Sequence, residues 1–324
     1  MVSADCGSLM TEPAESRLTL FAALGANLGI AVAKFVAAAL SGSSAMLTEG
    51  FHSVVDSLNQ LLLLYGQKRS RRPPDERHPL GYGRELYFWS FVVAILIFAT
   101  GAGLSIYEGV HHIRHPEPIR SPMINYVVLG VSLLLEGFSW TVAVREFGDA
   151  KGDQGWWDAV RQSKDPPTFV VLFEDSAAIF GLGVAGLGIT ASFLTGDARW
   201  DGVASVVIGL ALAGVALALA RESKGLLIGE AADPALEAAV RSAIDRRTEV
   251  TGVNEITTIH LGPRNIFVGL SVDFEDHVPV GRVEAMIAEA EDELRSRWPS
   301  IRAIYIKPQA RSKAGGETPM GEEG

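Results

Sequence analysis

Six blocks of mostly apolar residues, separated by short polar stretches, fill residues 18–220 of this 324-residue chain. A helix needs about 20 apolar residues to cross a bilayer, and each block approaches or exceeds that length. The pattern therefore predicts an α-helical membrane protein with six transmembrane helices. The expected spans are Leu18–Leu40, Ser43–Gln67, Leu86–Val110, Met123–Val144, Thr168–Leu194 and Asp201–Ala220.

The second block carries polar residues at helical spacing. Glu49, His52, Asp56 and Asn59 follow one another in steps of three, four and three, so they share one face of a helix. Ionisable groups are costly in hydrocarbon and usually face a bundle interior or a water-filled path. An imidazole one turn from a carboxylate suits a borderline cation such as zinc, and Glu49 is a further candidate ligand. A structural hydrogen-bond pair between helices is the alternative interpretation.

Further carboxylates interrupt the fourth and fifth blocks. If the second and fifth helices touch, His52, Asp56 and Asp175 would face one cavity, with an open position suited to an ion that must leave again. Glu174 lies about 100° around the helix from Asp175, so one of the two is expected to support the site or carry a proton. Glu136 either joins them or bonds a neighbouring helix. Protons would compete with a divalent cation for these groups, which is the physical basis of cation–proton exchange.

The composition changes after Arg221, and the pattern predicts a cytoplasmic α+β domain of ferredoxin-like type over 221–308. We expect residues 1–17 to form a cytoplasmic tail and residues 309–324 to be disordered. The expected helices are Pro234–Arg247 and Val280–Arg297, and the expected strands are Gly252–His260, Asn265–Phe274 and Ile301–Lys307, with a short additional strand at Gly225–Ile228.

Charge and composition predict the orientation and location of the protein and exclude several classes of function. Lys and Arg gather in the loops after the second and fourth blocks, which predicts both termini in the cytoplasm. No signal peptide is expected, and the short N-terminal region favours a bacterial inner (plasma) membrane. A net charge of −10 argues against nucleic acid, and the single cysteine, Cys6, excludes a disulfide framework. Neither a Walker loop nor an HExxH motif is present, so an enzyme is not expected.

Other histidines and acidic residues carry weaker signals. We expect Lys34, in the first block, to pair with a carboxylate. Two sets elsewhere are interpreted as solvated surface, with weak metal binding as the alternative. The first is His111, His112 and His115, in an expected outer loop, and the second is His260, Asp273, Glu275, Asp276 and His277, at expected strand ends.

Several runs of residues resemble the cation diffusion facilitator family, in the branch of the ninth mammalian zinc transporter. They are SGSSAMLTEGFHSVVDSLNQ at 41–60, HPLGYGRELYFWSFVVAILIF at 78–98, PPTFVVLFEDSAAIFG at 166–181 and GEAAD at 229–233. The resemblance covers most of the chain. It implies a homodimeric secondary transporter without a prosthetic group, which exports zinc or another divalent transition metal in exchange for protons.

The resemblance also implies a ligand set with one departure. The family's pair on the second helix corresponds to His52 and Asp56, and its pair on the fifth corresponds to Val171 and Asp175. Valine cannot bind a metal, so Glu174 or Glu136 would have to complete the site. Carboxylates in place of a nitrogen favour harder ions such as manganese or iron(II) beside zinc. The alternative function is a non-transporting regulatory or metal-sensing membrane partner with an incomplete site.

Overall fold

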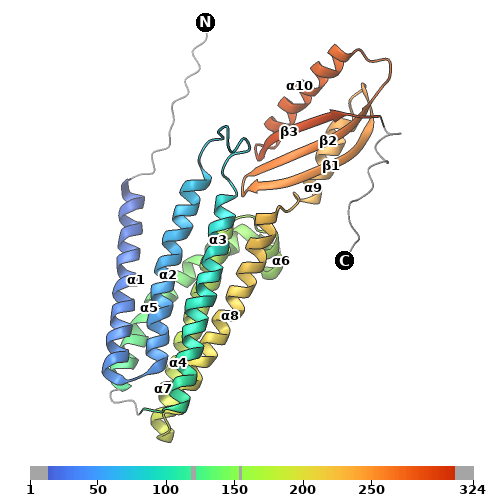
Figure 1. Ribbon diagram of the computed structural model, residues 1–324. Helices are drawn as coiled ribbons and strands as arrows, with labels where there is room; N and C mark the ends of the chain where they lie inside the picture. The colour runs from blue at the N-terminus through green and yellow to red at the C-terminus, as the bar shows by residue number, and fades with distance from the viewer. Residues whose placement is uncertain (1–13, 118–121, 153–154, 311–324) are drawn as a thin grey trace. The chain divides into compact units, whose positions relative to one another are not determined.

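The structure, a computed structural model, describes residues 14–117, 122–152 and 155–310 (Figure 1). These residues form two compact units. The helical unit comprises the described residues within 1–61, 93–152 and 170–218, and the second unit those within 62–92, 153–169 and 219–324. Several long helices have residues in both units.

Long helices make up the helical unit. The elements are α1 (Ala14–Ser41), α2 (Ser44–Ser70), α3 (Glu85–Leu96), the π-helical turn η1 (Ile97–Ala102), α4 (Gly103–Arg114), α5 (Pro122–Lys151), α7 (Pro166–Thr195) and α8 (Arg199–Ile228). Gly42, with φ of 76°, turns the chain between α1 and α2, because a left-handed backbone suits glycine best. His111 and His112 lie in the last turn of α4 rather than in the expected loop, since the helix continues to Arg114.

Four helices in the described part of the chain are long and apolar enough to cross a membrane. They are Glu85–Arg114, Met123–Asp149, Pro166–Thr195 and Arg199–Ile228. The described residues of α1 add a shorter apolar stretch, Asn27–Ser41. α2 is not among the four, because its polar stripe and basic last turn lower its mean hydropathy. The protein is therefore a helical, multi-pass membrane protein, and six spans stay a prediction.

Two helices pack closely at glycines. A Cβ added to Gly109 of α4 would lie 2.7 Å from the carbonyl oxygen of Gly202 in α8, and one added to Gly202 would lie 2.8 Å from that of Gly109. Any larger side chain would push the backbones apart, so these glycines allow α4 and α8 to touch directly.

The second unit contains a three-stranded sheet and two covering helices. Its elements include the short helix α6 (Trp156–Gln162), α9 (Pro234–Asp245), β1 (Val250–Gly262), β2 (Asn265–Phe274), α10 (Val280–Arg297) and β3 (Ile301–Pro308). β2 is central, antiparallel to β1 and parallel to β3. This order matches the expected sequence of helix, strand, strand, helix and strand. The sheet is small and mixed, and a ferredoxin-like fold stays a prediction.

The expected strand at Gly225–Ile228 is wrong, because these residues form the last turn of α8. Gly229 ends the helix with φ of 124° and donates its N–H to the carbonyl of Gly225 at 3.0 Å. A glycine after the last helical residue is a common helix terminator. The helix therefore extends past the expected end at Ala220.

Alternate residues of β2 place one sheet face in the core. Val268, Leu270 and Val272 are buried together with Val240 of α9 and Met286 of α10. Since side chains two apart on a strand share a face, both helices cover the same side of the sheet. Burying each such side chain contributes about 1.5–3 kcal/mol, so this layer stabilises the unit.

Candidate metal site

A cavity of ≈ 350 Å³ lies among α1, α2, α5 and α7 in the helical unit. We call it the acidic cavity, because Asp56, Glu136, Glu174 and Asp175 all line it. Three different helices supply these four carboxylates, as the sequence pattern predicted for the second and fifth blocks. Crowded carboxylates repel one another in a low-dielectric site, so the cavity favours whatever cation or proton reduces their charge.

Each of the two α7 carboxylates is held by a donor from another helix. Asn59 of α2 donates its amide to Glu174 Oε1 at 2.7 Å, and Ser139 of α5 donates its hydroxyl to Asp175 Oδ2 at 2.8 Å. Both side chains reach the same cavity although they are neighbours in sequence. Sequence reasoning placed Asn59 on the polar face but missed Ser139, which carries no sequence signal that distinguishes it from other helical serines.

The α2 pair lies one turn apart, as its spacing required. His52 Nε2 is 3.4 Å from Asp56 Oδ2, and His52 is almost fully buried. Asp56 lines the acidic cavity, whereas His52 is not among its lining residues. Val171 does line it and offers no donor atom. In this arrangement the ionisable groups that line the cavity are carboxylates, and the imidazole lies beside Asp56.

Glu49 is engaged elsewhere. Lys34 of α1 donates to Glu49 Oε2 at 3.1 Å and to Ser53 Oγ at 2.8 Å, and both Lys34 and Glu49 are fully buried. The expected pairing of Lys34 with a carboxylate is thus confirmed. Room for the Glu49 carboxylate comes from Gly181 of α7, where an added Cβ would clash with Glu49 Oε1. A side chain neutralised in this way is a poorer candidate ligand than those in the cavity.

The side chains of the candidate ligands do not form a complete coordination sphere in this structure. In the described ranges, no three histidine, cysteine or acidic side chains are placed so as to hold a metal ion together. The cavity gathers the carboxylates around one space, and rotamer changes would have to bring them onto an ion. The assignment of His52, Asp56, Asp175, Glu174, Glu49 and Glu136 as ligands stays a prediction.

The candidate metal-binding residues of the second unit lie at opposite ends of its β1–β2 hairpin. His260 pairs with Ile266 at one end of the β1–β2 ladder, while Asp273 pairs with Gly252 at the other. A single site cannot use both ends. Burial lowers the pKa of His260, whose ring nitrogen Nδ1 has no hydrogen-bond partner in the described protein.

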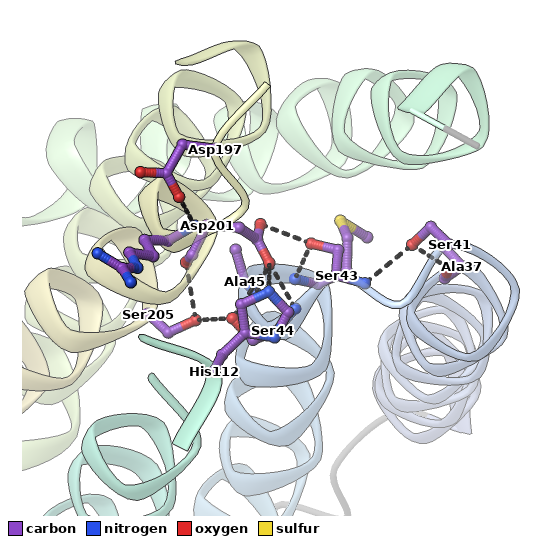
Figure 2. Close-up of polar contacts among 11 residues, drawn as sticks. Ala37, Ser41, Ser43, Ser44, Ala45, His112, Asp197, Asp201 and Ser205 are labelled. Carbon is purple, nitrogen blue, oxygen red and sulfur yellow. Dashed lines mark hydrogen bonds and ion pairs between the residues drawn. The ribbon is translucent and has the colours of Figure 1, made fainter. Parts of the chain in front are cut away.

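A polar network that the sequence did not reveal anchors the N-terminus of α2 (Figure 2). Asp201 of α8 is fully buried and accepts the backbone N–H groups of Ser44 at 2.6 Å and Ala45 at 3.3 Å. It also accepts the hydroxyls of Ser43 at 2.8 Å and Ser44 at 3.1 Å. A carboxylate satisfies the free N–H groups of a helix start and suits its positive dipole end. Asp201 therefore caps α2 from a different helix.

Comparison with known proteins identifies the family to which the chain belongs. The sequence matches the family of the cation efflux transmembrane domain over residues 20–228. It is 34% identical over 247 residues to the "Proton-coupled zinc antiporter SLC30A9, mitochondrial" of Xenopus laevis, covering 76% of this chain and 44% of that protein. For the human protein of the same name the identity is 33% over 248 residues, with the same two shares of 76% and 44%.

A plant relative and the length of the match complete the comparison. The chain is 32% identical over 267 residues to "Metal tolerance protein C4" of Arabidopsis thaliana, covering 82% of this chain and 58% of that protein. The chain thus spans about half the length of these curated relatives. The expected bacterial inner membrane is contradicted, because the relatives named as zinc antiporters are mitochondrial proteins. With its family match across most of the helices, the chain belongs to the cation efflux, or cation diffusion facilitator, family.

Proposed function

We propose that this protein is a secondary transporter that moves a divalent transition-metal cation, zinc in the first place, across a membrane in exchange for protons. The observation that carries the proposal is the acidic cavity, where carboxylates from α2, α5 and α7 meet. The names of the relatives, which include proton-coupled zinc antiporters, point in the same direction. They also favour a mitochondrial membrane as its location.

The exchange follows from charge balance in the cavity. Asp56, Glu174 and Asp175, with His52 behind them, are the ligands we propose for the ion. A divalent cation reduces the repulsion among these carboxylates, and protons on the same oxygens do so equally well. The two therefore exclude one another, which couples the departure of the metal to the arrival of protons. Glu136, which also lines the cavity, is proposed as a proton-carrying group.

Glu174 takes the place of the missing ligand in this proposal. Val171 lines the cavity one turn before Glu174 and contributes no donor atom, whereas the Glu174 carboxylate reaches the same space. The resulting set has more oxygen than nitrogen ligands. Manganese and iron(II) are accordingly proposed as secondary substrates, since carboxylate oxygen suits harder ions.

The larger assembly is proposed on the same grounds. α1, α2, the continuous helix from α3 to α4, α5, α7 and α8 would supply six spans over 18–220. Residues 221–308 would form a cytoplasmic ferredoxin-like domain, and the working protein would be a homodimer. Both termini would then lie on the cytoplasmic or matrix side.

The test is metal flux in proteoliposomes loaded with a metal-sensitive dye under an imposed proton gradient. Zinc, manganese and iron(II) are compared for the wild type and for Asp175→Asn, which keeps the side-chain shape but removes the charge. The matched control is Asp197→Asn, because Asp197 is an exposed residue beyond the end of α7. We expect zinc flux that Asp175→Asn abolishes and Asp197→Asn preserves. No gradient-driven flux of any ion by folded wild-type protein would refute the proposal.

A further inference from the structure

A second cavity of the helical unit, of ≈ 430 Å³, lies where α1 turns into α2 and where α4 ends. Gly42, at the turn, lines one side of it. We call it the histidine cavity, because three of the seven histidines of the chain line it: His111, His112 and His115. In the described part of the chain it shares no lining residue with the acidic cavity. The two cavities are therefore separate candidate sites.

The histidines of α4 lie on one side of the helix together with a carboxylate. Glu108, which also lines the cavity, precedes His111 by three residues and His112 by four. These steps keep the three side chains within an arc of about 100° around the helix. His115 follows one turn after His111, as the C-cap of α4. Two imidazoles four residues apart are the spacing with which helical histidine pairs bind zinc.

The rings of that pair already face one another. The ring centroids of His111 and His115 are 4.9 Å apart, and the ring planes are inclined by 35°. Stacking of two neutral rings at a helix end is the alternative explanation. A divalent cation bound by both rings accounts for the same proximity, since one ion can take a nitrogen from each imidazole.

The charges around the cavity favour a cation. Among the described residues that line it are two carboxylates, those of Glu108 and Glu117, and no lysine or arginine. The cavity also lies at the C-terminal end of α4, where the free carbonyl groups carry partial negative charge. Ring stacking gives no reason for these features, whereas both of them stabilise a bound cation.

His112 supplies a third imidazole from the inner wall of the cavity. It is 6% exposed, and its Nε2 atom has no hydrogen bond within the described protein. The nearest acidic partner, Asp201 Oδ2, lies 3.9 Å away and already accepts hydrogen bonds from the start of α2 (Figure 2). Buried nitrogen atoms without a hydrogen bond are rare in folded proteins. The ring is therefore a further nitrogen donor at this cavity.

An ion must draw these side chains together. In the part of the chain that the structure describes, no three of them are placed on one point, so only the His111–His115 pair is close to a binding arrangement. His111 and His115 are exposed, and exposed side chains change rotamer within nanoseconds. The same exposure lets an ion reach the rings directly from solvent.

We propose that the histidine cavity is a second site for a divalent transition-metal cation of the zinc type. His111 and His115 are its paired ligands, and Glu108 and His112 complete the set. The inference stands apart from the proposed antiport, because none of these residues lines the acidic cavity. Imidazole nitrogen suits zinc better than manganese, whereas the acidic cavity offers carboxylate oxygen. The two sites therefore differ in the ion that they prefer.

The experiment counts the metal bound to purified protein by equilibrium dialysis against zinc alone or manganese alone. His111→Gln and His115→Gln each remove one ring of the pair. His277→Gln is the matched control, because His277 is an exposed histidine of the second unit. Each substitution is made in the wild type and in Asp56→Asn/Asp175→Asn, which removes two charges from the acidic cavity. Gel filtration and circular dichroism verify that each variant is folded.

We expect Asp56→Asn/Asp175→Asn to bind a single zinc ion, and to bind manganese at least roughly tenfold more weakly. His111→Gln and His115→Gln should each weaken zinc binding at least roughly tenfold, because even the loss of a group that only orients a ligand costs 10–100-fold. His277→Gln should bind zinc as its parent does. X-ray absorption of the bound zinc should show nitrogen ligands at about 2.0–2.1 Å.

Unchanged zinc binding in both His111→Gln and His115→Gln would overturn the proposal. An equal loss in His277→Gln would also overturn it, because zinc would then bind to exposed histidines in general. If Asp56→Asn/Asp175→Asn does not fold, the comparison in the wild type decides. There, loss of one bound zinc ion on His111→Gln supports the site, and an unchanged total refutes it.

Discussion

Replacing Lys34 by methionine should destabilise the helical unit by about 3–4 kcal/mol. At the observed 3.1 Å separation from Glu49 and an effective dielectric constant of about 20, the lost attraction is about 5 kcal/mol. Protonation of the abandoned carboxylate limits the cost. Protonating a glutamate side chain at pH 7 costs about 3.7 kcal/mol, because its ordinary pKa is about 4.3. Direct measurements on broken buried ion pairs fall at about 3–5 kcal/mol, which agrees with this limit.

The double variant Lys34→Met/Glu49→Met distinguishes the ion pair from a general packing loss. Replacing both partners by apolar groups of similar volume is often neutral, so most of the cost of either single variant should be recovered. Equilibrium unfolding in mixed detergent micelles at pH 7 measures the four free energies of the cycle. Arg199→Met is the control, because Arg199 is exposed at the start of α8. Single variants that cost less than about 1 kcal/mol, or a double variant that costs the sum of both, would refute the reasoning.

Three further predictions concern packing and pH. Burial lowers the pKa of His260, so the unfolded chain takes up a proton at this position before the folded chain does as the pH falls below about 6.5. The free energy of unfolding should therefore fall from pH 7 to pH 5. In His260→Gln the free energy of unfolding should depend less steeply on pH over this range. Met286→Ala should cost about 2–5 kcal/mol in chemical unfolding, because the side chain is fully buried in the sheet core, and a loss below about 1 kcal/mol would contradict that placement. Gly109→Ala should lower the melting temperature, because its new Cβ would meet the α8 backbone at 2.7 Å, with an overpacking cost of about 1–3 kcal/mol. The matched change Gly130→Ala on α5, where nothing lies within 4 Å, should instead stabilise the helix by up to about 1 kcal/mol.

The sequence predicted the elements of the metal site because helical spacing is a local property. Steps of three and four residues place His52 beside Asp56 in any α-helix, and the structure keeps that relation. The shared cavity of Asp56 and Asp175 followed from the cost of exposing either to lipid, which brings such groups together in a bundle interior. The order of elements in the second unit was likewise predictable from the period of its apolar residues.

Partners distant in sequence could not be predicted in the same way. Asp201 caps α2 from more than 150 positions away, and a lone aspartate at a helix start carries no information about which helix it will satisfy. The positions of His260 and Asp273 at opposite ends of the hairpin depend on the register of β1 and β2. Gly225–Ile228 is helical although a strand is expected there, because a short apolar run fits a strand as well as a helix and the glycine that ends the helix lies directly after it.

The acidic side chains of the helical unit divide into two groups by their partners, and the division separates structure from function. Glu49 is bound by Lys34, and Asp201 is bound by the helix start that it caps, so neither carboxylate has charge left for a cargo ion. Asp56 and Asp175 face a shared cavity, and in the part of the chain that the structure describes neither forms an ion pair with a lysine or arginine. Maintaining unneutralised carboxylates in a helical bundle is costly, and a fold has no need of them for stability. Asp56 and Asp175, rather than Glu49 or Asp201, are therefore the carboxylates that the proposed exchange of a metal for protons would use.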